Sequence, residues 1–261
     1  MHSSADKKEV RENGLLAALS SEEFDRLWPN LEEVVLPLGE ILHNFNDVVT
    51  HLYFPNQNAI VSVLSTTDEQ VNVEVGLIGS EGAVGLTGFL GRDRSPFQHL
   101  VQGSGTATRL PLEFAREEFQ RNGNRLQRLL LRYTHALLVQ IAQTGLCNRV
   151  HSDEQRLARW LLLSQDRIGR NQLPLPGELL AKMLGRSHSG VSIIAAILQT
   201  AGLIKYNGAE LVIVDRDGLE AVSCSCYWVV RRHYQDLYAP TGQVSVLHTD
   251  APAGRFGAAP R

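Results

Sequence analysis

Residues Leu179–Ile204 read LLAKMLGRSHSGVSIIAAILQTAGLI, and this stretch predicts a helix-turn-helix. Leu180 and Leu184 lie four residues apart, on one face of a first helix. Gly185 falls where that helix should end, because the residue after a helix often needs a positive φ. Ser187 can then cap a second helix through its hydroxyl. We expect the second helix to bury four apolar residues, which are Val191, Ile194, Ile197 and Leu198.

A hairpin is expected directly after the second helix. Two β-type runs, Leu203–Tyr206 and Leu211–Val214, flank the turn pair Asn207-Gly208. Two crossed helices beside a hairpin are the winged form of a DNA-reading module. An ordinary αα-hairpin has the same apolar spacing and is the alternative. Three residues favour the DNA-reading form, since each meets a separate steric demand: the small Ala181 in the first helix, Gly185 in the turn, and the apolar Val191 six positions later.

Composition places the chain among globular proteins. Its 261 residues are enough for one large or two ordinary domains, and 43% of them are hydrophobic. No apolar run reaches the roughly 18 residues of a membrane span, and the polar N-terminus lacks the apolar core of a secretory signal. Three widely spread cysteines do not make a disulfide framework. We therefore expect a cytoplasmic protein without membrane contact, and nothing in the sequence requires a metal or cofactor.

Charge is distributed unevenly along the chain. The net charge is −3, which alone argues against nucleic acid. Residues 1–121 hold 9 Lys and Arg against 18 Asp and Glu, whereas residues 149–206 hold 8 against 4. Residues 122–148 add three Arg and no acid. An acidic first half joined to a basic middle is expected when only one part meets phosphate, although a solvated helical surface gives a similar split.

The first half predicts a β-barrel. Two short helices, Leu15–Leu19 and Ser21–Trp28, come first, and Ser20 with Glu23 fits a capping box. Many short strands with regular turn signals then predict a jelly-roll-like barrel. The expected strands are Val34–Leu36, Glu40–Leu42, His51–Phe54, Ala59–Leu64, Gln70–Ile78, Gln98–Val101 and Thr106–Leu110.

A long helix is predicted after a short one at Pro111–Gln120, from a cap at Asn124 to about Thr144. Its apolar residues are spaced three or four positions apart. This spacing is close to that of a coiled-coil seam and predicts a dimer interface. These residues are Leu126, Leu130, Tyr133, Leu137 and Ile141, while Leu129, Leu138 and Ala142 are expected to face the barrel. The alternative is a helix buried in its own domain. Residues Gly145 to His151 are the expected hinge.

The fold class that follows is α+β. We expect a jelly-roll sensor barrel at 14–121, a dimerisation helix and hinge at 122–147, a winged helix-turn-helix domain at 148–238 and a disordered tail at 239–261. Within the third unit, Asp153–Ile168 is an amphipathic helix, Asn171–Pro176 a polar connection and Asp217–Tyr238 one closing helix.

This order of units resembles the Crp/Fnr family of bacterial transcription regulators. The most specific stretches are YFPNQNAIVSV, VEVGLIGSEGAVGL, CNRVHSDEQRLARWLL, LAKMLGRSHSGVS and QTAGLIKYNGAELVIVDRDGLEAVSCSCY. The resemblance implies a homodimer on a palindromic operator in double-stranded DNA, a barrel that senses a signal, RNA polymerase as a further partner, and no enzymatic activity. A sensor that acts through protein contacts without binding DNA is an alternative.

The resemblance also identifies an effector pocket. In members that bind cyclic AMP, a Gly-Glu pair meets the ribose and a following Arg-Ser or Arg-Thr meets the phosphate. Here Leu86 stands where that Glu is expected. Arg94-Ser95 resembles the Arg-Ser pair, but it lies about one residue away from the expected position and is followed by a proline. A ribose hydroxyl buried against Leu86 without a partner costs about 1–3 kcal/mol, so we expect no tight binding of cyclic AMP. The candidate pocket residues are Gly82, Val84, Gly85, Leu86, Arg94 and Ser95.

The recognition helix differs from that of the best-known members, which use Arg and Glu early and a further Arg one turn later. The matching positions are His188, Ser189 and Ile193, so the operator should differ from the well-known consensus. Arg186 is expected to contact phosphate rather than a base. The candidate DNA-binding residues are Arg186, Ser187, His188, Ser189, Gly190, Ser192, Ile193 and Lys205.

Other chemistry fits less well. An iron-sulfur site needs about four thiolates, and the first half has no cysteine. Cys224 and Cys226, two apart in one helix, should point to different sides, so we expect buried structural thiols and no metal site. Cys147, at the hinge, is a weaker candidate thiol sensor. A cupin-like metal barrel is the alternative from another class, built on His43, His51, His99 and Glu74, although these residues form no sequence cluster. Haem bound by one of those histidines is a further alternative.

Overall fold

The structure is a computed structural model that describes residues 10–66, 72–121 and 124–239, except for the side chains of Lys182 and His188. The predicted tail lies outside the described residues from position 240 onward. In the described part of the chain, no helix combines the length and the apolar character needed to cross a bilayer.

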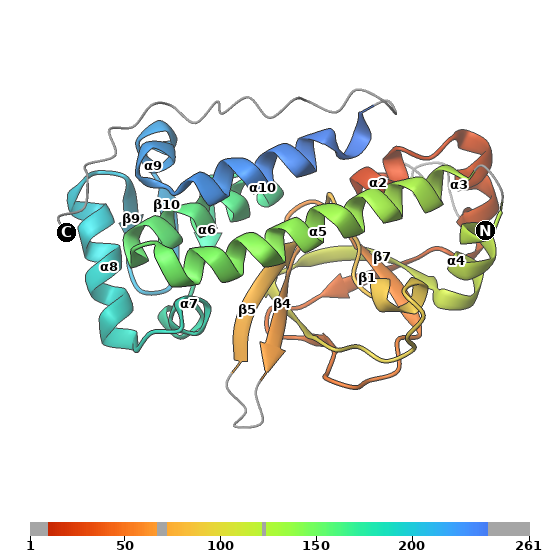
Figure 1. The fold of residues 1–261 in the computed structure, drawn as a ribbon, viewed down its shortest axis with the longest axis horizontal. Helices are drawn as coiled ribbons and strands as arrows, with labels where there is room; N and C mark the ends of the chain where they lie inside the picture. The colour runs from red at the N-terminus through yellow and green to blue at the C-terminus, as the bar shows by residue number, and fades with distance from the viewer. Residues whose placement is uncertain (1–9, 67–71, 122–123, 240–261) are drawn as a thin grey trace.

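The first half is a β-barrel of two antiparallel sheets (Figure 1). One sheet has the strand order β1-β7-β3 and the other β2-β6-β4-β5. Each predicted strand is present, with ends moved by at most two residues. The strands are β1 (Glu32–Leu36), β2 (Ile41–His43), β3 (His51–Pro55), β4 (Ile60–Thr66), β5 (Asn72–Ile78), β6 (Gln98–Gly103) and β7 (Gly105–Pro111).

The two faces of the four-stranded sheet have different partners. Val61 and Val63 of β4 point into the barrel and belong to its core. Ile60 of β4 and Leu77 of β5 belong instead to the core of the second domain. Residues alternate between the two faces of a strand, so one sheet serves both cores. The C-terminal domain is thus packed directly on the outside of the barrel.

Short helices precede and follow the barrel. Ser20 and Glu23 form the predicted capping box at α3 (Ser21–Leu27). Asn13 caps α2, and its side-chain nitrogen donates to the carbonyls of Pro55 and Gly82, which fixes the N-terminal segment to the barrel. The remaining elements are α2 (Gly14–Ala17), η1 (Trp28–Asn30), η2 (Leu86–Phe89) and α4 (Leu112–Phe119).

The long helix α5 (Arg125–Val150) is 26 residues long and differs from the prediction in two ways. It continues through Gly145, so the chain breaks at His151 rather than over the expected hinge at Gly145 to His151. The predicted dimer seam is also wrong in its N-terminal part. Leu126, Leu130 and Tyr133 are buried in the chain's own core, because that face packs on the barrel, and Leu137 packs against the same core. Leu138, expected to face the barrel, is 61% exposed.

From α6 to its hairpin, the second domain is built as predicted, with one addition. It contains α6 (Asp153–Ile168), α7 (Gly177–Leu184), α8 (His188–Thr200) and the hairpin β9 (Ile204–Tyr206) and β10 (Glu210–Ile213). The connection expected to be irregular contains a third strand, β8 (Gln172–Pro174), which pairs with β10. Its three residues are too few to give an alternating pattern that the sequence could reveal.

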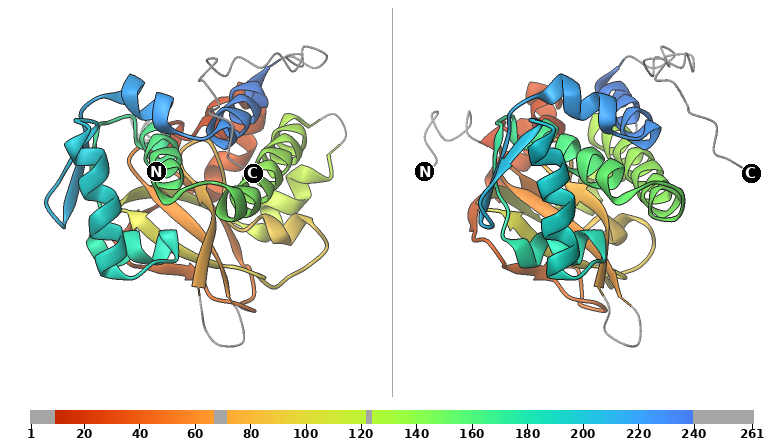
Figure 2. Two further views of the ribbon diagram at one scale, coloured as in Figure 1. Left: turned by 60° about the vertical axis from the view of Figure 1, so that its left-hand side comes forward. Right: turned by 90° about the vertical axis from the view of Figure 1, so that its left-hand side faces the viewer.

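The closing segment is two helices rather than one. Asp215, not Asp217, caps α9 (Arg216–Val222). Ser223 and Cys224 are extended, and α10 (Ser225–Gln235) and η3 (Asp236–Tyr238) follow. Figures 1 and 2 show α10 lying along α5, back toward the barrel. The Tyr133 and Tyr234 rings lie 6.3 Å apart at this contact.

Arg167 of α6 is the main polar contact between the two domains. Its Nε lies 3.0 Å from Glu81 Oε1 in the loop after β5, and its Nη2 donates to Gln140 Oε1 of α5 at 2.6 Å. Its guanidinium lies 5.0 Å from the centre of the Tyr234 ring in α10. Trp160, also in α6, adds a second contact by donating to Glu74 Oε1 of β5 at 2.7 Å.

Two histidines are buried together inside the barrel. The rings of His43 and His99 lie 5.4 Å apart, and the Nδ1 atom of each has no hydrogen-bond partner in the structure. Burial lowers the pKa of His99 to about 3, and the charge of His43 acts in the same direction. Burial also lowers the pKa of His43, against the opposing effect of Asp47.

We predict that this pair makes the fold sensitive to acid. Since the folded pKa of His99 lies below its unfolded value, the unfolded state binds more protons below about pH 6.5. The contribution of the neutral His99 to the free energy of unfolding is therefore fully present above that pH and is lost as the pH falls toward 3. Replacing His99 with Gln should flatten the dependence of unfolding free energy on pH between 6.5 and 5, by up to about 1.4 kcal/mol per pH unit. Urea unfolding at several pH values measures this, with the unmodified protein as the reference.

Candidate nucleic-acid interface

The turn between α7 and α8 has the geometry that its sequence predicts. Gly185 has φ +61°, which favours glycine. The Arg186 amide donates to the Ala181 carbonyl at 3.0 Å and so closes the end of α7. Ser187 is the N-cap of α8, and its hydroxyl accepts from the Gly190 amide at 3.3 Å. The two helices are held at a fixed angle by these local bonds.

The outer face of α8 is open in the structure. Val191, Ile194 and Leu198 are buried as predicted, but Ile197 is 47% exposed, which corrects its assignment to the buried stripe. Ile193 is 64% exposed, and Ser187, Ser189 and Ser192 also lie on the surface. His188 begins the helix, but its side chain lies outside the described residues. Figure 1 shows α8 at the edge of the molecule, away from the barrel.

An ion-pair network at the start of α6 supports the turn. Asp153 Oδ2 lies 2.8 Å from Arg186 Nε, and Asp153 Oδ1 lies 2.8 Å from Arg156 Nη1. Buried Arg156 also donates to the Leu184 carbonyl at 2.8 Å, which satisfies the end of α7. Arg186 therefore already has a carboxylate partner, which a phosphate would have to displace. Asp153 and Arg156 position the turn and were not predicted, although their i,i+3 spacing directly after the cap Ser152 is present in the sequence.

Gly190 is not required by the packing of the chain. A Cβ at this position would meet Ser187 Oγ at 3.4 Å and Arg186 Cβ at 3.8 Å, which are ordinary contact distances. A glycine inside a helix costs about 1 kcal/mol relative to alanine. Gly190 thus lowers the stability of α8 and leaves the outer surface of this helix open to close approach by another molecule.

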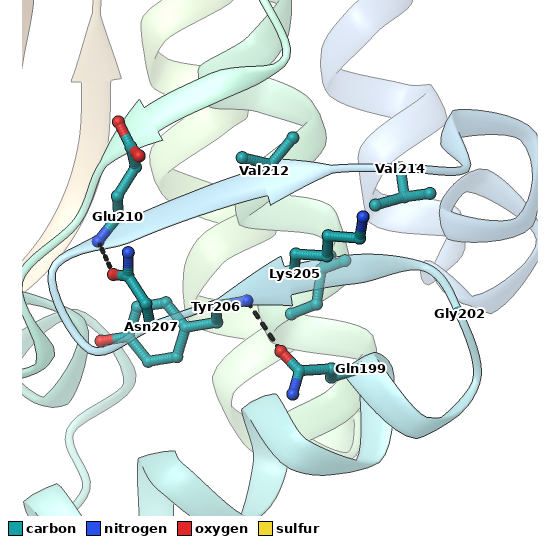
Figure 3. A pocket seen from close by; sticks show the side chains of 9 residues that line it. Gln199, Gly202, Lys205, Tyr206, Asn207, Glu210, Val212 and Val214 are labelled. Atoms are coloured by element: carbon teal, nitrogen blue, oxygen red, sulfur yellow. Dashed lines mark hydrogen bonds between the residues drawn. The ribbon is translucent and has the colours of Figure 1, made fainter.

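The hairpin forms a wing beside the end of α8. Gly208 has φ +92°, and Asn207 Oδ1 accepts from the amides of Ala209 and Glu210, which closes the turn. Gln199 of α8 accepts from the Tyr206 amide at 2.8 Å, so the wing is attached to the helix. Figure 3 shows these contacts around a groove between the two elements, with the exposed Lys205 along its wall.

The predicted effector residues are not brought into one pocket. Val84 is buried in the barrel core, and a Cβ on Gly82 would lie 2.3 Å from the Tyr133 hydroxyl. Gly85 has φ +99° and Leu86 is buried at the start of η2. These four residues are close-packed. Arg94 and Ser95 instead line a separate, mainly apolar groove with Phe45, Thr87 and Leu90.

Of the residues of the cupin alternative, His43 and His99 lie on one face of the four-stranded sheet and Glu74 on the other, whereas His51 belongs to β3 of the other sheet. His43 and His99 are inside the barrel, together with Val101. Glu74 is on the outside, where Ser62 donates to its Oε2 at 2.8 Å and Gln102 at 2.7 Å. Burial raises the pKa of Glu74, and its three donors oppose that rise. The sheet separates the histidines from the carboxylate, so these residues do not form one metal site.

Comparison with known proteins agrees with this geometry. Residues 155–222 match the model of a Crp-like helix-turn-helix domain. No curated protein sequence matches the chain.

Solved structures share the fold over most of the chain. FixK2 from Bradyrhizobium japonicum is 15% identical, with a TM-score of 0.64, covering 74% of this chain and 98% of that one. A candidate Crp/Fnr-family transcriptional regulator from Eubacterium rectale is 17% identical, with a TM-score of 0.61, covering 80% and 97%. A candidate cyclic nucleotide-binding protein from Ruegeria pomeroyi is also 17% identical, with a TM-score of 0.54, covering 90% and 99%. Residues 155–222 are therefore a Crp-like helix-turn-helix domain, which this chain carries on the fold of Crp/Fnr-type transcription regulators.

Proposed function

We propose that the protein is a dimeric, sequence-specific transcription regulator that reads DNA with α8. The observation that carries this proposal is the open outer face of α8, next to Arg186 on one side and Lys205 on the other. Ile193 and Ile197 offer apolar contacts suited to thymine methyl groups, and Ser189 offers a hydroxyl for a base edge. Arg186 and Lys205 supply charge for phosphate.

The dimer uses the face of α5 that is opposite to the barrel. Leu131, Leu138 and Leu146 are 51%, 61% and 50% exposed, which is high for leucine on a helix of this length. With exposed His135 and Ala142 they repeat at steps of four, three, four and four, close to a coiled-coil seam. Two helices paired along this seam would give the two recognition helices that a palindromic site with half-sites about 34 Å apart needs.

The effector of the barrel is a molecule other than cyclic AMP. Leu86 offers no acceptor to a ribose hydroxyl. Arg94, the residue nearest to the expected phosphate ligand, donates to the Asn46 carbonyl at 2.7 Å. The tyrosine packed on Gly82 fills space beside the predicted cassette. Contact with RNA polymerase stays a prediction from the resemblance.

The DNA-binding proposal is tested by selecting duplexes from a random library and measuring affinity by fluorescence anisotropy. We expect an inverted repeat. Arg186→Ala should weaken binding to all duplexes alike and reduce the slope of log K against log salt by about 1, because one phosphate contact is lost.

Gly190→Ala should stabilise α8 by up to about 1 kcal/mol. It should nevertheless weaken DNA binding roughly tenfold, because a methyl group then stands between α8 and the groove of the DNA.

Arg92→Ala is the matched control, since this arginine is exposed on the barrel. No duplex affinity at low salt would remove the proposal. A change of preference at a single base pair in Arg186→Ala would show that this residue reads a base.

The dimer proposal is tested with Leu138→Glu. Two buried carboxylates at the seam should convert the dimer to monomer and raise the dimer dissociation constant by at least about tenfold, as measured by analytical ultracentrifugation. Leu90→Glu is the control, because Leu90 is 56% exposed on the barrel. A dimer of unchanged stability in Leu138→Glu would place the interface elsewhere.

Calorimetry tests the effector proposal. The missing ribose partner should weaken the binding of cyclic AMP by about 1–3 kcal/mol relative to a site that has this carboxylate. Titration should therefore give no dissociation constant at or below about 10 μM. Leu86→Glu restores the acceptor and should strengthen any residual binding. Micromolar or tighter binding to the unmodified protein would show that the cassette works without this carboxylate.

A further inference from the structure

Four metal-ligating side chains meet where α10 begins against the end of α5. They are Cys147, His151, Cys224 and Cys226, and their ligand atoms all lie within 4.8 Å of one another. Cys147 Sγ lies 3.5 Å from Cys224 Sγ, and Cys226 Sγ lies 3.6 Å from His151 Nδ1. The three thiols are 0%, 3% and 1% exposed and form a cluster of their own, apart from both domain cores.

The backbone brings these side chains together without strain. Cys147 lies in the last turn of α5, and His151 is the C-cap of this helix, whose amide donates to the Cys147 carbonyl at 3.1 Å. Cys224 is the N-cap of α10 with φ −81° and ψ 161°, whereas Cys226 is already helical. This break is why two cysteines two apart can converge. In the single helix expected from the sequence, they would have pointed to different sides.

The distances suit one tetrahedral ion. Zinc bonds of about 2.3 Å to sulfur and 2.0–2.1 Å to nitrogen give edges of about 3.8 Å between two sulfurs and about 3.6 Å between sulfur and nitrogen. The two measured edges are close to these values. A cluster of several irons would need its ligands farther apart than one ion does. A disulfide needs the two sulfurs at about 2.05 Å and would leave the third thiol and the imidazole without a role.

A buried arginine is placed to balance the charge of such a site. Zinc with three thiolates and a neutral histidine carries one excess negative charge. Arg159 of α6 is 5% exposed and donates to Thr144 Oγ1 at 3.2 Å, one turn before Cys147 on α5. Its Nε is buried and has no hydrogen-bond partner in the structure. Arg159 is therefore a buried cation close to Cys147, and its charge would offset the excess negative charge of such a site.

We propose that Cys147, His151, Cys224 and Cys226 form a Cys3His zinc site that clamps α10 to the end of α5. The clamp lies directly before Ser152, the cap of α6, and so at the point where the DNA-binding domain leaves the long helix. The three thiols and one imidazole are soft and borderline ligands, which favour zinc over magnesium or calcium. Metal binding there would stabilise the position of the whole second domain.

Metal analysis of untagged protein, purified under reducing conditions with zinc in the medium, tests this. We expect about one zinc per chain, and replacement by Co²⁺ should give the thiolate charge-transfer and tetrahedral d–d absorption bands. All three cysteines of the sequence belong to this cluster, so any cobalt–thiolate band reports on it. Cys226→Ser and His151→Ala should lower the zinc content to below about 0.1 per chain and lower the melting temperature.

His233→Ala is the matched control, because the His233 and His135 rings meet 5.2 Å apart in the same α5–α10 contact. It should retain its zinc. If the cysteine variants fail to fold, release of zinc from the unmodified protein by a thiol-blocking reagent, followed with a chromogenic chelator, gives the same answer. Absence of zinc and of cobalt–thiolate bands in reduced protein offered either ion overturns the proposal, as does an iron-sulfur spectrum.

Discussion

One buried guanidinium makes the central polar contact between the two domains. Arg167 belongs to α6, yet its partners are the loop after the barrel sheet, the long helix and the C-terminal helix. Burial alone would lower its pKa, but Glu81 and its other neighbours hold that pKa above the ordinary value, so the charge is kept. Removing one partner of such a pair costs about 3–5 kcal/mol, because the other charge stays buried. Gly79 is part of the same constraint, since a Cβ there would lie 2.7 Å from the side chain of Arg167.

The long helix serves three surfaces at once. Its inner face closes the barrel core, a second face contacts α6 and α10, and its outer face carries the exposed leucines. A helix has about 3.6 residues per turn, so these roles are separated only by rotation around one axis. In the proposed dimer, a change in the pairing of the two helices would therefore move the barrel and the helix-turn-helix domain of each chain together.

Local signals in the sequence were sufficient for most of the fold. Strand alternation, the Ser20–Glu23 capping box and the Gly185 turn are each specified by neighbouring residues, and the structure confirms them. The errors occur where tertiary packing decides. Two apolar stripes on α5 have nearly equal spacing, and only the barrel determines which one is buried. The break at Cys224 depends on how α9 and α10 pack against α6 and α5, and the sequence around it is compatible with an unbroken helix. The cluster of cysteines joins residues about 75 positions apart, beyond any spacing rule.

The segment Gly79–Gly82 joins the barrel to the C-terminal part of the chain. It precedes the stretch that resembles a nucleotide cassette, and it contacts Arg167 through Glu81 and Tyr133 through Gly82. The Glu81 carbonyl also accepts from the Tyr238 hydroxyl at the end of η3. The segment α10–η3 is thus held at the barrel by this loop and at its other end by the cysteine cluster. In the proposed regulator, a rotation of the second domain would have to loosen one of these two ends. An effector in the barrel would act at the loop end, and it would shift the population of domain poses by changing how well that loop binds Arg167 and Tyr238.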